Sequence, residues 1–281
     1  GMASLKSLDL TSWDVSGAEH FARMFDGCSL LVSLDLSGWD VSRGTDLSTM
    51  LSGLSSLTVL NLSDWDASCA TSVLAGLTDP ALLQSLRLSG LAVSQGNISG
   101  MFEPLSGLTS LDVSNWTISG SPNLSGMLAS LPSLSSLNIP SWDVSGATSL
   151  SGLFSGCAKI ESLDLSSWDV SRVCDFSSMF AGDAALASLD LSSWDMGSAR
   201  DLSSMFSGCE SLESLDLSGW DVSSAKKFAS IFKGCSSLEH LCLSDWNLSS
   251  RTDLSPIFAD CSALVTLDLS NWKAVGATGL S

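Results

Sequence analysis

The stretch SLDLSGWDVS occupies residues 33–42 and recurs without a change at residues 214–223. It is part of a repeat that runs through the whole chain, in which the tryptophans form one column spaced by 26 residues. The spacing fails once, between Trp65 and Trp116, where Leu91 lies one period after Trp65 and one residue short of a period before Trp116. The sequence therefore predicts about eleven units of 26 residues, with one residue deleted between Leu91 and Trp116.

The first half of each unit has the spacing of a leucine-rich repeat. The first unit follows the pattern L-x-x-L-x-L-x-x-W-x-V, with Trp in a place that usually holds Asn or Cys, through Leu5, Leu8, Leu10, Trp13 and Val15. Leucines that alternate with polar residues indicate a short strand with its leucines in the core. Strands that recur once per unit must pair in parallel, and we expect their polar side chains to line a concave face.

The second half of each unit has the features of a short helix. Thr, Ser or Asp precedes a Leu-x-x-Met-Phe segment and Gly follows it, which is typical of an N-cap, an apolar helix face and a C-terminal glycine. We expect one or two turns of α or 3₁₀ helix on the convex side of each unit. One phenylalanine column should stack in the core: Phe25, Phe102, Phe154, Phe180, Phe206, Phe232 and Phe258.

Together these features predict an α/β solenoid, a leucine-rich-repeat right-handed superhelix with a parallel concave sheet and short convex helices. A single unit is too small to bury its apolar face, so stability must come from the stacking of neighbouring units. We expect residues 1–281 to form one such domain, with irregular units around 65–132. The irregular units fit either sequence drift in a tolerant array or a functional bulge. Because the chain starts and stops within the repeat pattern, we expect a fragment of a longer protein.

The net charge of −18 narrows the classes of partner. The 12 Lys and Arg residues are scattered singly, whereas nucleic acids and anionic membranes both require clustered cations. No apolar run reaches the roughly 18–20 residues of a membrane span, and no secretory signal opens the sequence. The sequence therefore predicts no nucleic-acid binding and no membrane insertion by this segment.

The residues that carry most enzyme chemistry are sparse. His20 and His240 lie too far apart to share a site, about 40 Å at the usual spacing of parallel strands. No metal, phosphate-binding or nucleophile motif occurs, so we expect no catalytic residue, no cofactor and no metal site. A cysteine column shares its place with leucines in other units, which indicates small, buried, free thiols. Its members are Cys28, Cys157, Cys209, Cys235 and Cys261. Occasional disulfide bridges between neighbouring units are the alternative, since members of the column would lie about 5 Å apart.

Two segments carry the repeat most fully, LDLSSWDVSRVCDFSSMFAGD at residues 163–183 and LDLSGWDVSSAKKFASIFKGC at residues 215–235. They resemble the repeat of the BspA-like leucine-rich-repeat family of bacterial surface proteins and lipoproteins. The resemblance implies an extracellular solenoid on the bacterial cell surface that serves adhesion or ligand binding rather than catalysis. It implies no particular ligand, so the expected partner is a protein or glycan of a host or neighbouring cell.

An outward column of mostly acidic residues follows the predicted strands: Asp9, Asp35, Asn61, Arg87, Asp112, Asn138, Asp164, Asp190, Asp216, Cys242 and Asp268. Like charges about 5 Å apart repel by roughly 0.8 kcal/mol in water, so something must offset them. Solvent, serine hydroxyls and partial protonation are one explanation, and a cationic partner or a divalent ion is the other. The acidic residues are densest in the last units, where the candidate ligand-binding residues are Asp164, Asp190, Asp216, Asp268, Glu213, Glu239 and His240. A small metal site at His240 and Cys242 stays open as an alternative.

A second acidic column directly follows the tryptophans: Asp14, Asp40, Asp66, Asp143, Asp169, Asp195 and Asp221. We expect these carboxylates to accept backbone N–H groups in a turn, with help from the serine two residues later. A calcium ladder is the alternative, because carboxylates suit that ion. The tryptophans themselves are expected in the core rather than on a sugar-binding platform, since Leu91 can replace a Trp in a core but not in a platform.

The function predicted from the sequence is a non-enzymatic adhesion or ligand-binding module that binds through its acidic concave face. Two alternatives stay open. The repeats could form a structural spacer or stalk that projects other domains, or they could form a surface-layer array stabilised by calcium.

Overall fold

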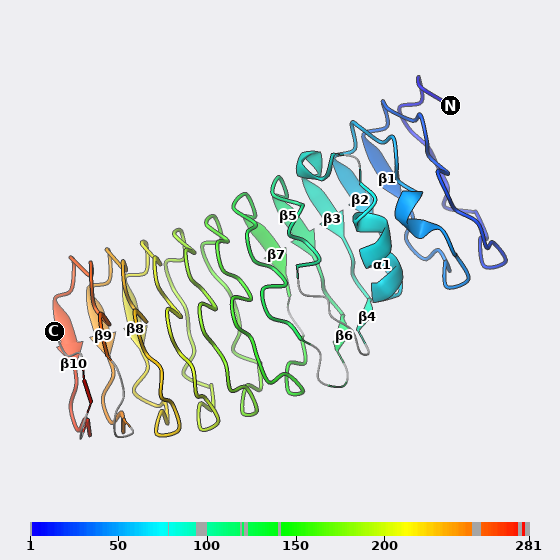
Figure 1. Cartoon of the computed structure of the whole chain (residues 1–281). Helices are drawn as coiled ribbons and strands as arrows, with labels where there is room; N and C mark the ends of the chain where they lie inside the picture. Colours follow the sequence, from blue (N-terminus) through cyan, green and yellow to red (C-terminus); the bar gives the residue numbers. More distant parts are fainter. Residues whose placement is uncertain are drawn as a thin grey trace.

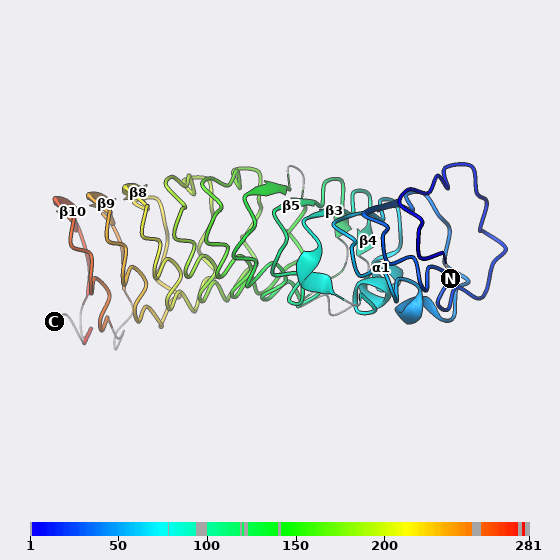
Figure 2. The ribbon, with the colours of Figure 1, turned by 90° about the horizontal axis from the view of Figure 1, so that it is seen from above.

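In this computed structural model the chain forms an elongated stack of coils, and the two termini lie at opposite ends (Figure 1). The structure describes residues 2–77, 79–93, 100–118, 120, 123–139, 142–248, 254–274 and 277–278. Seen from above, the main strands follow one long side of the stack and the return segments of the units follow the other (Figure 2). We call the first side the strand face; it presents the exposed strand side chains from Ser33 to Asp268.

Parallel strands of three residues form the main column of the stack. In chain order they are β1 (Ser33–Asp35), β2 (Val59–Asn61), β3 (Ser85–Arg87), β5 (Ser110–Asp112), β7 (Ser136–Asn138), β8 (Ser214–Asp216), β9 (His240–Cys242) and β10 (Thr266–Asp268). An isolated parallel bridge between Ser162 and Ser188 lies between β7 and β8. Leu86 pairs with Leu111, so the deleted residue is absorbed between β3 and β5. The predicted solenoid of parallel strands is confirmed.

Stacked side chains fill the interior behind the strands. The central leucines of the strands, such as Leu60 and Leu86, are fully buried while their neighbours face outward. Behind them Phe206 stacks between Phe180 and Phe232, with ring centroids 5.6 and 5.7 Å apart. The phenylalanine stack is therefore confirmed from Phe154 to Phe258, while Phe25 and Phe102 are buried in the same core. Because each side chain packs on its counterpart in the next unit, stability comes from contacts between neighbouring units.

The tryptophan column is buried, as predicted, and it makes a hydrogen bond that the sequence pattern does not reveal. Trp220 and Trp246 are stacked with ring centroids 6.4 Å apart, whereas Trp13, in the first unit, is 53% exposed. Several buried indoles donate their N–H to a backbone carbonyl of the preceding unit, for example Trp142 to Val113 O at 2.9 Å. The indole thus fills a place that usually holds Asn and links the backbones of adjacent units.

Trp168 differs from its neighbours, because its buried Nε1 has no hydrogen-bond partner among the described residues. Trp194 is equally buried, but its Nε1–H donates to Leu165 O at 3.2 Å. Replacing Trp194 by Phe should therefore lower the free energy of unfolding by about 0.5–1.5 kcal/mol more than replacing Trp168 by Phe. Only the first change removes a hydrogen bond, and Leu165 O keeps the backbone N–H of Trp168 at 3.1 Å. Chemical denaturation of both variants measures this difference, and equal losses would contradict the assigned bond.

Helix is scarce in the described part of the chain, so the prediction of a convex helix in every unit is wrong. The helical elements there are α1 (Ala67–Leu74) and two single 3₁₀ turns, η1 (Leu47–Thr49) and η2 (Pro80–Leu82). None of them is long and apolar enough to cross a lipid bilayer. The other return segments are mainly successions of turns.

The return segments form turns because some of their residues have a left-handed backbone. In one unit Ser178 and Gly182 have φ values of 56° and 80°, which a continuing right-handed helix excludes. The amide of Phe180 donates to Met205 O at 2.9 Å. The amide of Gly182 donates to Ser207 O at 2.7 Å, so both bonds reach the next unit. A second ladder between units therefore replaces the internal hydrogen bonds of the predicted helix.

The irregular units around 65–132 contain α1 and a second, small sheet. Its strands β4 (Ala92–Val93) and β6 (Thr117–Ile118) pair in parallel, outside the main column. Ala92 pairs with Thr117, directly after the places of Leu91 and Trp116, so the tryptophan column keeps its register across the deletion. The stack thus continues through the units whose sequence departs most from the repeat.

Candidate functional site

The acidic column lies on the strand face in single file. Asp216 and Asp268 are the last residues of β8 and β10, and Asp164 and Asp190 hold the same place in the two units before β8. All four side chains are exposed. The placement follows from the alternation of strand side chains, because a residue next to a buried leucine points outward.

Each of these aspartates also stabilises its own turn, a role that the sequence pattern predicted only for the second acidic column. Asp164 Oδ1 accepts hydrogen bonds from the backbone N–H and the hydroxyl of Ser166, at 3.2 and 2.7 Å. Asp190 and Asp216 each accept the backbone N–H of the serine two residues later at 3.0 Å. In each of these aspartates Oδ1 accepts the hydrogen bonds of the turn, and Oδ2 takes no part in them.

The same turn recurs at two further corners of the unit. In the second acidic column, Asp169 Oδ1 accepts the N–H of Ser171 at 3.0 Å, which confirms the predicted turn. In the return segment, Asp201 Oδ1 accepts the N–H of Ser203 at 3.0 Å. The signal that could have revealed all three turns is the motif Asp-x-Ser, which occurs three times within residues 163–183.

These bonds keep the four aspartates ionised. At Asp164 and Asp268 the serine hydroxyl is the main cause that holds the pKa below its ordinary value, and the serine backbone N–H adds to it. At Asp190 and Asp216 the backbone N–H is the main cause that lowers the pKa. Partial protonation therefore does not offset the charge of these four carboxylates at neutral pH.

Charge is distributed unevenly along the strand face. In β1, β2, β3, β5 and β7 the charged residues are Asp35, Arg87 and Asp112. In the later units, the exposed residues of the strand and the residue just before it include seven carboxylates and no Lys or Arg: Glu161, Asp164, Asp190, Glu213, Asp216, Glu239 and Asp268. The later half of the face is therefore mainly anionic, and its strand positions carry no Lys or Arg.

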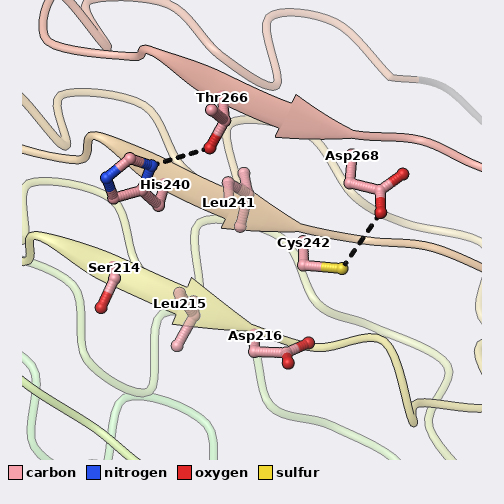
Figure 3. A pocket seen from close by; sticks show the side chains of 8 residues that line it. All are labelled: Ser214, Leu215, Asp216, His240, Leu241, Cys242, Thr266 and Asp268. Atoms are coloured by element: carbon pink, nitrogen blue, oxygen red, sulfur yellow. Dashed lines mark hydrogen bonds between the residues drawn. The ribbon is translucent and has the colours of Figure 1, made fainter.

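A hollow of about 240 Å³ lies where His240 and Cys242 interrupt the acidic column (Figure 3). Its lining consists of Ser214, Leu215, Asp216, His240, Leu241, Cys242, Thr266 and Asp268. His240 Nδ1 lies 2.8 Å from Thr266 Oγ1, and Cys242 Sγ–H points to Asp268 Oδ2 at 3.8 Å. Carboxylates of β8 and β10 thus stand on either side of Cys242, an arrangement suited to a small cationic group.

The remaining candidate residues lie beside this hollow or along the same file. The backbone N–H of Glu239 donates to Glu213 O at 2.9 Å, so these two residues are neighbours just before β9 and β8. Glu239 Oε2 lies 4.0 Å from His240 Nε2. Asp164 and Asp190 lie in the units before β8, so the structure brings Asp216, Asp268, His240 and Glu239 closer together than these two.

The cysteines are free, as expected, and all eight lie in the described residues. In the buried column Cys235 Sγ–H donates to Phe206 O at 3.1 Å, and burial raises the pKa of this thiol to about 12. Across the described ranges, no group of three or more His, Cys, Asp or Glu side chains is arranged to hold a metal ion. The metal site considered at His240 and Cys242 therefore gains no support from the geometry.

Solved structures with similar coils differ widely from this chain in sequence. The mouse RP105/MD-1 complex is similar over 88% of this chain and 39% of that chain, at 25% identity and a TM-score of 0.43. The Toll–Spatzle complex of Drosophila is similar over 90% of this chain and 39% of that chain, at 16% identity and a TM-score of 0.42. The leucine-rich repeat domain of APL1B is similar over 98% of this chain and 69% of that chain, at 16% identity and a TM-score of 0.40. The chain thus spans well under half the length of the first two.

The sequence itself matches one family. No curated protein matches the chain in sequence. A family model described as "Mycoplasma protein of unknown function, DUF285" matches residues 1–79, 96–215 and 182–279, which is most of the chain. The BspA-like resemblance stays a prediction. The chain belongs to the family described as Mycoplasma protein of unknown function, DUF285.

Proposed function

We propose that this chain is a non-enzymatic binding module at a bacterial cell surface, whose acidic strand face receives a basic segment of a partner protein and so serves adhesion. The observation that carries the proposal is the file of exposed carboxylates from Glu161 to Asp268, with no Lys or Arg at the strand positions or directly before them. Opposite charges on a partner would steer its approach and fix its position along the file. The proposal treats residues 1–281 as one domain of about eleven units in a right-handed superhelix.

A protein partner fits this surface better than a glycan. The tryptophan rings that could stack on sugars are buried in the core; Trp194, Trp220 and Trp246 are at most 3% exposed. A neutral glycan would also leave the ionised carboxylates without a counter-charge. A lysine- or arginine-rich segment supplies both the charge and the hydrogen-bond donors that the free carboxylate oxygens can accept.

The test variant removes four negative charges from the strand face and keeps the hydrogen bonds of its turns. In a variant with Asp164, Asp190, Asp216 and Asp268 all changed to Asn, each side chain retains an Oδ1 acceptor for its turn. Four exposed ion pairs at about 0.2–1 kcal/mol each would be lost, so the affinity for a lysine-rich peptide should fall by roughly tenfold. Isothermal titration calorimetry at physiological salt measures the dissociation constant.

The matched control removes the same charge from the second acidic column. Asp143, Asp169, Asp195 and Asp221 use the same kind of turn and are equally exposed, so their change to Asn alters the net charge by the same amount. Binding to the control variant should change by less than about threefold. If both variants lose affinity equally, binding follows net charge and the strand face is not the site.

The shape of the stack favours a second candidate, a spacer that projects other domains. The chain forms an elongated stack with its termini at opposite ends, as a stalk requires (Figure 1). A spacer needs no ligand on its strand face. If the wild-type chain binds the lysine-rich peptide no better than the neutralised variant does, the spacer replaces the binding module as the proposed function.

A further inference from the structure

A buried carboxyl group interrupts the cysteine column of the core. Asp183 stands where Cys157 and Cys209 stand in the adjacent units, and it is only 1% exposed. Its Oδ1 accepts the backbone N–H of Cys157 at 2.8 Å. Its Oδ2 is buried and makes no hydrogen bond within the part of the chain that the structure describes. A polar oxygen in such a place is costly even when neutral, and far more costly when charged.

The surroundings of Asp183 favour its protonated form. Burial raises the pKa of its carboxyl group to about 8, although the N–H of Cys157 partly opposes the shift. The titratable groups that respond to its charge are the thiols of Cys157 and Cys209, and the pKa of both is raised, first by burial and also by the nearby carboxyl group of Asp183. Neither thiol supplies a positive charge. When the Asp183 proton leaves for solvent, the carboxylate therefore has one hydrogen bond and no counter-ion.

We propose that Asp183 is a pH-sensitive opening point of the stack, and that its ionisation separates the coils around it and exposes Cys157 and Cys209. The separation stays local, because the stability of a solenoid is a sum of contacts between neighbouring units. The two thiols donate to Leu128 O and Phe180 O at 3.2 Å in the closed stack. Opening breaks these bonds and admits solvent to both sulfurs.

Thiol alkylation tests this inference independently of the proposed function. The full chain is treated with iodoacetamide at pH 6.5 and pH 8.5, and peptide mass spectrometry gives the rate at each cysteine. Cys235 is the internal control, since it is buried in the same column and its Sγ–H donates to Phe206 O in the same way. The rates at Cys157 and Cys209 relative to Cys235 should rise at least about tenfold at the higher pH, following the ionised fraction of Asp183.

The variant Asp183→Asn keeps the size of the side chain and cannot ionise, so its relative rates should stay flat between the two pH values. Asp183→Cys restores the usual residue of the column and should behave in the same way. An equal rise in either variant would overturn the inference. A rise at Cys235 in parallel with the other two would also overturn it, because the stack would then open as a whole.

Discussion

Replacement of Trp220 by alanine is expected to lower the free energy of unfolding by about 4–6 kcal/mol. The side chain is 3% exposed, stacks on Trp246 with ring centroids 6.4 Å apart, and contacts Phe206 at a centroid distance of 6.5 Å. Truncation of a buried aromatic residue costs about 3–5 kcal/mol. It also removes the hydrogen bond from the indole N–H to Leu191 O at 3.3 Å, one of two that this carbonyl accepts, which adds about 1 kcal/mol. Chemical denaturation followed by circular dichroism measures the change.

The control is the first tryptophan of the column. Trp13 also stacks on its neighbour Trp39, with ring centroids 6.3 Å apart, but it is 53% exposed. Trp13→Ala should therefore cost less than about 1.5 kcal/mol, since little apolar area leaves the core. Similar losses at the two positions would mean that the column is not the buried core that the structure describes.

Asp183→Asn is expected to stabilise the fold, by an amount that grows with pH and reaches the order of 4 kcal/mol at pH 7. Burial raises the carboxyl pKa from 3.8 to about 8 in the folded chain, and the unfolded chain restores the ordinary value. Each pKa unit corresponds to about 1.4 kcal/mol. Between these two pKa values the folded state holds a proton that the unfolded state releases, so the stability of the wild type falls as the pH rises.

The pH dependence separates this effect from any change in packing. Below about pH 4 Asp183 is protonated in both the folded and the unfolded wild type. It therefore does not make the free energy of unfolding depend on pH in that range. From about pH 4 to pH 8 the difference between Asp183→Asn and the wild type should grow by about 1.4 kcal/mol per pH unit. Denaturation curves at pH 4, 5.5 and 7 measure the slope. A constant difference across this range would show that Asp183 is ionised in the folded protein.

The period of the repeat was enough to predict the main architecture. Each column of the sequence became a column of the structure: Leu60 and Leu86 in the core, Phe206 between two phenylalanines, and the aspartates on the strand face. These features depend only on side-chain alternation and on stacking one period apart. The helical prediction failed because a Leu-x-x-Met-Phe segment has the same apolar spacing in a succession of turns as in a helix.

The chemistry of the candidate site was only partly predictable. The repeat period predicted that Asp164 and Asp190 lie on one exposed face. The hydrogen bonds within the turns, which lower the pKa of both, depend on where the chain bends after each strand. The burial of Asp183 was not predicted, although its place in the cysteine column is the signal that could have revealed it. No such signal exists for its unpartnered oxygen, because that depends on the positions of donors in the units on both sides.

Hydrogen bonds join neighbouring units both along the strands and along the return segments, and this limits the ways in which the length of the chain can change. Most hydrogen bonds and ring contacts between units join a residue to one about a period away, as Leu34 pairs with Leu60 and Phe180 with Phe206. Gain of one whole repeat would insert a coil that meets both neighbours with the correct partners, whereas gain of half a repeat would set tryptophans against return segments. The reach of the molecule can thus change in steps of about 4.8 Å while the chemistry of the strand face is kept.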